Sequence, residues 1–193
     1  AAGRRRASCR HVTLPTGEAF RTDAKAEGNE VAIGGWQTSV TSDPKQAKRF
    51  SVKLDEANTP WLRTRGEPFQ VIAYLELLVT LYAVMAFWPR DASDGGLVTL
   101  TGTGITDNEG NSYVVSRMLT TKFPLCATLV ELAEQLESRG SWLKQAWCPR
   151  EQNIEADALT NGDFHQFSPE NRIEMDPVDM KWVILDEMLE AGG

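Results

Sequence analysis

The sequence predicts an α/β domain built on a mixed five-stranded sheet flanked by helices, with a C-terminal helical extension. Three observations predict this class: β-prone segments at the start of the chain, a long apolar segment in its middle, and later amphipathic segments on either side of a further strand. The chain has 193 residues, of which 41% are hydrophobic, and this is enough for one domain with an appendage.

The predicted strands come first along the chain. A Gly-Asn turn at residues 28–29 separates two extended segments and indicates a hairpin, and a Thr-rich, β-prone segment ends near residue 106. The last strand would join a parallel part of the sheet. Strands are predicted over residues 18–24, 30–39, 49–54, a segment ending near 106, and 142–147.

The predicted helices follow from apolar residues at helical spacing. Leu125, Leu129, Leu132 and Leu136 recur on one face of the best example. A final helix over residues 178–193 would present Met180, Val183, Ile184, Leu185 and Met188, and it would cover the domain or dock a neighbouring protein. Helices are predicted over residues 71–88, 111–119, 124–139, a short segment around 157, and 178–193.

Composition narrows the function. The chain holds 27 acidic and 20 basic residues, a formal charge of −7, so it lacks the basic balance of a general polyanion binder and any nucleic-acid contact must be local. Its three cysteines form no Cys-x-x-Cys pair, which indicates a reducing, intracellular compartment. The start has no Met and no apolar run behind its arginines, which indicates a piece of a longer chain without a secretory signal.

The apolar segment 71–88 is just long enough to span a membrane, but Glu76 lies inside it. A carboxylate in mid-membrane costs roughly 2.5 to 3.5 kcal/mol, so we expect a buried helix packed on the sheet and no membrane association. A buried Glu76 needs a pairing partner or a metal ion. The simple alternative is that Glu76 faces solvent at the helix start.

Three other carboxylates follow strands or lie in a late helix. Asp23 lies in the first strand, Asp107 ends the Thr-rich strand, and Asp157 lies in the short helix. Each alone has an ordinary explanation as a turn residue, a helix cap or a solvated side chain. Four carboxylates at one sheet edge, however, would repel one another unless cations neutralised them, so the pattern favours divalent metal.

At these residues the sequence resembles the ribonuclease H family, specifically the domains attached to reverse transcriptases of retroelements. The matching segments are FRTDA, AYLELL, ITDNEGNSYVVSRMLTTKFP and AWCPREQNIEADALTNG. The resemblance covers residues 17–161 and implies a ribonuclease H-like domain there. The composition of the two ends predicts a flexible N-terminal arm at residues 1–16 and an extension with a final helix at 162–193. The resemblance also implies hydrolysis of the RNA strand of RNA/DNA hybrids, recognised by the 2′-OH and duplex shape.

The resemblance assigns metal ligands by position. Asp23, Glu76, Asp107 and Asp157 would be the catalytic residues and would hold two Mg²⁺ ions, or Mn²⁺. Asp23 would bridge both ions, Glu76 and Asp107 would complete one coordination sphere, and Asp157 would complete the other.

The substrate contacts are predicted less directly. Asn108 and Asn111 are placed to approach sugar or phosphate, with helix capping as an equal alternative. The loop before the last acid reads CPREQNIE and lacks the histidine that many members of the family carry there, so Arg150 would contact phosphate instead. Basic residues are scattered, and a linked reverse transcriptase would help to hold the substrate.

Two alternatives belong to other classes. A degenerate or domesticated domain could act as a structural or protein-interaction module, which the acidic charge and the missing histidine permit. A 3′ to 5′ exonuclease of the same fold is disfavoured, because such enzymes usually carry Asp-x-Glu in the first strand, whereas this chain has Asp23, Ala24 and Lys25.

Overall fold

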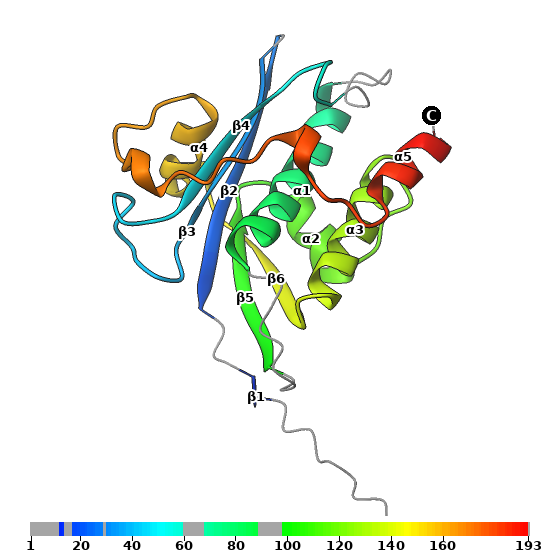
Figure 1. The fold of residues 1–193 in the computed structure, drawn as a ribbon, viewed down its shortest axis with the longest axis horizontal. Helices are drawn as coiled ribbons and strands as arrows, with labels where there is room; N and C mark the ends of the chain where they lie inside the picture. Colours follow the sequence, from blue (N-terminus) through cyan, green and yellow to red (C-terminus); the bar gives the residue numbers. More distant parts are fainter. Residues whose placement is uncertain (1–11, 14–16, 29, 60–67, 89–97, 193) are drawn as a thin grey trace, which may run out of the picture.

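The computed structural model describes residues 12–13, 17–28, 30–59, 68–88 and 98–192 (Figure 1). The predicted N-terminal arm therefore lies outside the described residues, apart from Val12–Thr13. Among the helices of the described ranges, none is long and apolar enough to cross a lipid bilayer.

The predicted mixed five-stranded sheet is confirmed. Strands β2, β3 and β4 form an antiparallel meander, and β5 and β6 extend it in parallel on the β2 side, so the order is β6-β5-β2-β3-β4. A two-residue strand, β1 (Val12–Thr13), also pairs with the start of β5. The five main strands are β2 (Glu18–Glu27), β3 (Glu30–Gln37), β4 (Arg49–Leu54), β5 (Val98–Thr106) and β6 (Ser141–Trp147).

Helices cover both faces of the sheet (Figure 1). One face carries α1 (Pro68–Phe87), α2 (Glu109–Arg117) and α3 (Leu125–Glu137), which share the main hydrophobic core. The other face carries the short helix α4 (Ile154–Thr160), which packs on β2, β3 and β4 over a smaller apolar cluster. The helix predicted over 71–88 is thus α1, and the one predicted over 111–119 begins two residues earlier.

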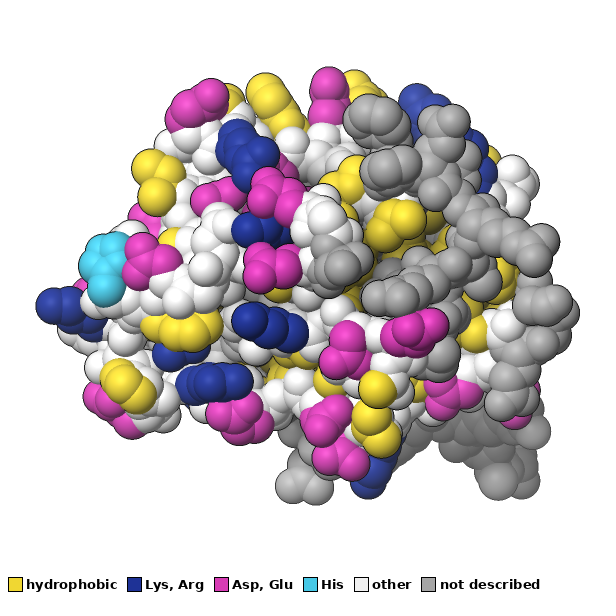
Figure 2. Space-filling model, turned by 90° about the horizontal axis from the view of Figure 1, so that it is seen from above, with side chains coloured by type: hydrophobic (Ala, Val, Ile, Leu, Met, Phe, Trp, Pro, Cys, Tyr) yellow, Lys and Arg dark blue, Asp and Glu magenta, His cyan; other side chains and the backbone are white. Residues whose placement is uncertain are grey.

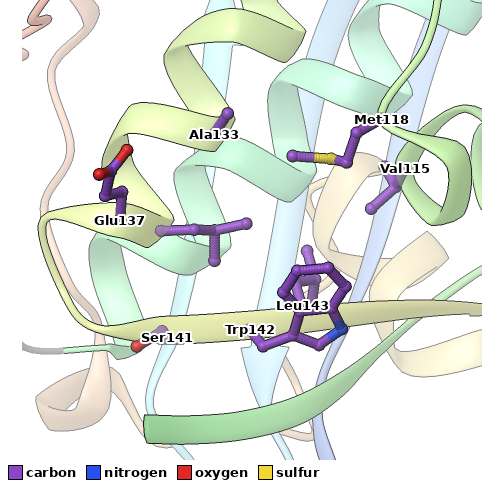
Figure 3. A pocket seen from close by; sticks show the side chains of 8 residues that line it. Val115, Met118, Ala133, Glu137, Ser141, Trp142 and Leu143 are labelled. Atoms are coloured by element: carbon purple, nitrogen blue, oxygen red, sulfur yellow. The ribbon is translucent and has the colours of Figure 1, made fainter. Parts of the chain in front are cut away.

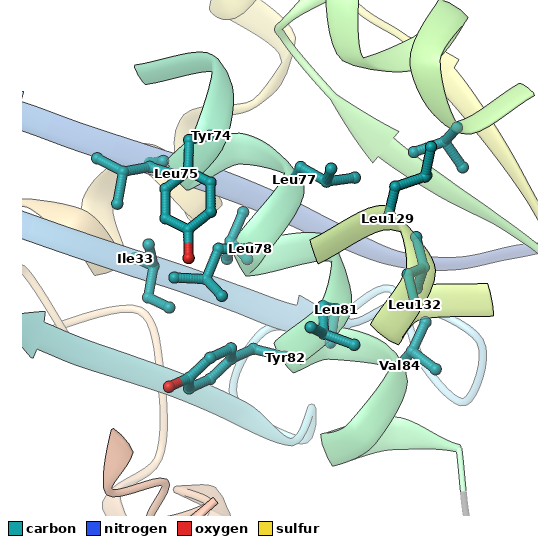
Figure 4. Close-up of a cluster of buried hydrophobic side chains, with 14 of the residues drawn as sticks. Ile33, Tyr74, Leu75, Leu77, Leu78, Leu81, Tyr82, Val84, Leu129 and Leu132 are labelled. Carbon is teal, nitrogen blue, oxygen red and sulfur yellow. The ribbon is translucent and has the colours of Figure 1, made fainter. Parts of the chain in front are cut away.

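The core explains why α1 is apolar almost all round. Its residues between Tyr74 and Val84 are buried, with Leu77 and Leu81 near Leu129 and Leu132 of α3 in Figure 4. A helix packed between a sheet and a second helix has little solvent-facing surface, so its sequence needs no polar stripe.

Gly34 lets α4 approach the sheet closely. A Cβ atom at this position of β3 would lie 2.8 Å from Leu159 Cβ, which is shorter than side chains tolerate. Gly34 is also the cross-strand partner of Asp23 on β2. The absence of a side chain here therefore brings α4 next to the strand that carries Asp23.

The prediction of a helix over 178–193 is wrong in its first half. Residues 177–179 form a single 3₁₀ turn, the chain then runs extended, and α5 spans only Leu185–Gly192. Partly buried Met180 and Trp182 alternate with exposed neighbours, the two-residue period of an extended segment, and Trp182 lies against Tyr82 of α1 at a ring distance of 5.7 Å.

The start of α5 is held by a side chain of another helix. The Glu131 carboxylate of α3 accepts hydrogen bonds from the main-chain N–H groups of Val183, Ile184 and Leu185, at 2.8 to 3.1 Å. These are N–H groups that have no partner within a helix of their own, so Glu131 caps α5 from outside.

Candidate metal centre

Asp23, Glu76 and Asp107 converge at one sheet edge. One carboxylate oxygen from each lies within 4.8 Å of the others. The sheet register explains two of the three positions: Arg21 of β2 pairs with Ile105 of the parallel strand β5, so Asp23 and Asp107 each lie two residues further along. Helix α1 packs on β2 and supplies Glu76.

Glu76 is a fixed, buried carboxylate. Its side chain is 2% exposed, Oε1 accepts a hydrogen bond of 3.2 Å from the Ala24 main-chain N–H, and Oε2 accepts one of 2.9 Å from Thr106 Oγ1. Burial holds the pKa of Glu76 well above its usual range, with the charges of Asp23 and Asp107 as further causes. The alternative of a solvent-facing Glu76 is therefore excluded.

The other two carboxylates share this environment. Asp23 is 3% exposed, and burial raises its pKa to about 7, with the charges of Asp107 and Asp157 acting in the same direction. Burial also raises the pKa of the half-buried Asp107, while the nearby Arg150 guanidinium opposes that rise. Burial is the main cause of all three raised pKa values and the charges of neighbouring acids add to it, so a bound cation would stabilise the ionised forms.

Asp157 lies beside this group but is engaged differently. Its Oδ1 forms an ion pair of 2.8 Å with Arg150 Nη2, and its Oδ2 accepts a hydrogen bond of 3.0 Å from Asn161 Nδ2. Its charge still reaches Asp23 and Asp107, because it raises the pKa of both. The structure thus brings three of the four predicted acids together and places the fourth beside them.

The two predicted asparagines differ in position. Asn108 lines the carboxylate pocket, and its Oδ1 accepts a hydrogen bond of 3.1 Å from the Asn111 main-chain N–H, so it caps α2 as the alternative had it. Asn111 is only 1% exposed and is not among the residues that line the pocket.

Two threonines belong to the site but were not predicted from the sequence. Thr106 Oγ1 donates to Glu76, and Thr160 Oγ1 donates a hydrogen bond of 2.7 Å to Asp23 Oδ2. Each lies one or three residues from a predicted acid, which is the only sequence signal for them. Their hydroxyls orient two of the carboxylates, as the supporting residues of metal sites do.

Two pockets of similar volume differ in the chemistry of the residues that line them. The carboxylate pocket is about 200 Å³ and its lining includes Asp23, Glu76, Asp107, Lys25 and Arg150. An apolar pocket of about 240 Å³ lies between α2, α3 and β6, where Met118, Trp142 and Leu143 line it in Figure 3. Hard oxygen donors are the ligands that Mg²⁺ prefers, so the first pocket suits a divalent cation and the second does not.

The surface of the described residues carries both signs of charge. Among the side chains coloured in Figure 2, Lys and Arg lie interspersed with Asp and Glu on the face seen from above in Figure 1. Any contact with a polyanion on this face would depend on individual cations.

Comparison with known proteins gives the fold a name. No protein-family model and no curated protein matches the chain. The structure of LC11-RNase H1 in complex with an RNA/DNA hybrid is similar, with a TM-score of 0.53, 17% identity, and coverage of 74% of this chain and 93% of that one. RNase H1 from the halophilic archaeon Halobacterium salinarum NRC-1 gives a TM-score of 0.47 and 19% identity, over 77% of this chain and 98% of that one. The similarity to LC11-RNase H1 shows that the chain has a ribonuclease H-like fold.

Proposed function

We propose that this protein is a divalent-metal-dependent endonuclease of the ribonuclease H type, which hydrolyses the RNA strand of RNA/DNA hybrids. The observation that carries the proposal is the convergence of Asp23, Glu76 and Asp107 within 4.8 Å, on a fold shared with an RNase H1 that was solved with such a hybrid. Buried carboxylates with raised pKa values are a frequent mark of a functional site.

The four acids would hold the metal, with Asp157 joining the other three. Mg²⁺ or Mn²⁺, as two ions in this proposal, would activate water and neutralise charge on the phosphate. Hydrogen bonds already fix two of these carboxylates. The Ala24 N–H and the Thr106 hydroxyl donate to the two oxygens of Glu76, and the Thr160 hydroxyl donates to one oxygen of Asp23. Ligands fixed in this way need little reordering when a cation binds.

Asn108 and Arg150 are the proposed substrate contacts. Because Asn108 Oδ1 already caps α2, its Nδ2 is the group free to donate to a sugar or phosphate oxygen. The guanidinium of Arg150 is 70% exposed at the pocket and could donate to a phosphate. Asn111, being buried, is left out of this proposal.

We also propose that the chain comes from a retroelement. The four matching segments support an origin in a retroelement reverse transcriptase, with residues 17–161 as the nuclease domain and 162–193 as an extension that packs on it through Leu185 and Leu189. A linked polymerase domain would provide part of the contacts that bind the hybrid.

Cleavage of a labelled hybrid tests the function. The full chain with Mg²⁺ should cut the RNA strand of a hybrid and spare double-stranded DNA, and Asp23→Asn should reduce cleavage by about a hundredfold or more, because one of the proposed metal ligands would be lost. Asp179→Asn removes an exposed carboxylate outside the pocket and serves as the matched control. Equal cleavage by wild type and Asp23→Asn would reject the proposal and favour a structural module.

A further inference from the structure

Arg150 stands out among the cations of the pocket. Its guanidinium pairs with Asp157 at 2.8 Å, and Asn161 bonds the second oxygen of that carboxylate, so both oxygens of Asp157 are engaged. Lys25, the other pocket cation, instead bonds Asn161 Oδ1 at 2.9 Å and approaches Glu27 at 3.3 Å.

The charge of Arg150 acts on the whole acidic group. Arg150 lines the same pocket as Asp23, Glu76 and Asp107 and pairs with Asp157 at 2.8 Å. Its positive charge therefore partly offsets the negative charge of the carboxylates that a divalent cation would bind.

The backbone that carries Arg150 is anchored, whereas its side chain is exposed and is held by the ion pair with Asp157. Arg150 begins a single 3₁₀ turn, Arg150–Gln152, and the turn is tied to β2 at two points: Asn153 Nδ2 donates to the Thr22 carbonyl at 2.9 Å, and Arg21 Nη1 donates to the Gln152 carbonyl. The exposed guanidinium lies at the end of a long side chain, so it can leave Asp157 without any movement of the turn.

We propose that Arg150 is an internal counterion, which occupies Asp157 in the metal-free protein and is displaced from it when a divalent cation binds the carboxylate group. This inference rests on the proposed function, because it presupposes a metal site. Arg150 is then a positioning residue that competes with the metal: it stabilises the metal-free site, lowers the metal affinity, and becomes available to a phosphate oxygen only after the metal has bound.

Calorimetric titration with Mn²⁺ and Mg²⁺ tests the competition. Arg150→Gln should bind the metal about threefold to tenfold more tightly than wild type, since the competing ion pair with Asp157 is lost. Arg150→Lys keeps the charge and should bind like wild type. Arg117→Gln removes an exposed arginine that lies over Tyr113 at the far end of α2, so it should leave the affinity unchanged.

The outcomes separate the two proposals. If wild type binds metal and Arg150→Gln binds it equally or more weakly, Arg150 does not compete with the metal, but the proposed metal site is supported. No binding by any variant would overturn both the counterion and the metal-dependent function.

Nuclear magnetic resonance of the arginine side chains gives a second readout. The paired guanidinium of Arg150 should show slowed Nη exchange without metal, and saturating Mg²⁺ should shift and broaden its signal. Asp157→Asn should produce the same signal without metal, because it removes the partner. If saturating Mg²⁺ changes neither the position nor the width of the Arg150 signal, Arg150 is not displaced and the proposal is wrong.

Discussion

Thr160 Oγ1 donates a hydrogen bond of 2.7 Å to Asp23 Oδ2, and this bond joins α4 to the middle of β2. It lowers the pKa of Asp23 against the effect of burial. The hydroxyl thus keeps a buried carboxylate easier to ionise and ready to bind a cation.

Thr160→Val should therefore move the acidic limb of the pH–rate profile to higher pH. Without the donor, Asp23 keeps its proton up to a higher pH, so cleavage near pH 6.5 should fall severalfold while the rate at pH 9 stays closer to wild type. Thr160→Ser retains the hydroxyl and should restore the wild-type profile. Identical profiles for the Val and Ser variants would show that the hydroxyl has no effect on Asp23.

The raised pKa of Asp23 predicts how stability depends on pH in the absence of metal. Its folded pKa of about 7 lies above the unfolded value of about 3.9, so its favourable contribution is complete below about pH 4 and is lost as the pH rises to 7. Asp23→Asn removes this loss. Urea unfolding in EDTA should show the variant gaining on wild type between about pH 4 and pH 7, by up to a few kcal/mol. A difference in stability between Asp23→Asn and wild type that does not change with pH would contradict the assignment.

Metal should stabilise the folded protein most where the acids are ionised. A ligand that binds only the folded state adds about 2.7 kcal/mol at one hundred times its dissociation constant. Mg²⁺ or Mn²⁺ should therefore raise the melting temperature by several degrees at pH 8, by less at pH 6, and hardly at all in Asp23→Asn. Differential scanning fluorimetry with matched ionic strength is the measurement, and a rise that is equal in wild type and variant would point to a site elsewhere.

Gly34→Ala should displace α4 from the sheet. The added Cβ would lie 2.8 Å from Leu159 Cβ, and overpacking of this kind costs about 1 to 3 kcal/mol. Because Asp157 and Thr160 belong to α4, cleavage should fall together with stability. Gly17→Ala meets no atom within 4 Å and is the matched control. Wild-type stability of Gly34→Ala would mean that α4 tolerates a wider spacing.

The sequence was informative where a pattern reflects burial. The five strands and helix α1 could be predicted, because β-prone segments and a long apolar run are local signals. The grouping of Asp23, Glu76 and Asp107 was expected from the resemblance to the ribonuclease H family. The bond from Thr160 to Asp23 joins residues 137 positions apart, so no local signal reveals it. The segment around Met180 was misassigned because its apolar residues suit both a helix and an extended chain.

The cap that Glu131 places on α5 bears on where this protein can be shortened. A chain that stopped at residue 161, the end of the family resemblance, would leave this fully buried carboxylate without the three main-chain donors at Val183, Ile184 and Leu185. Residues 162–193 themselves help to bury Glu131, so their removal would expose this carboxylate together with the apolar surface of α3 that α5 covers. We therefore expect a chain that ends at residue 161 to unfold more readily than one that ends at residue 192.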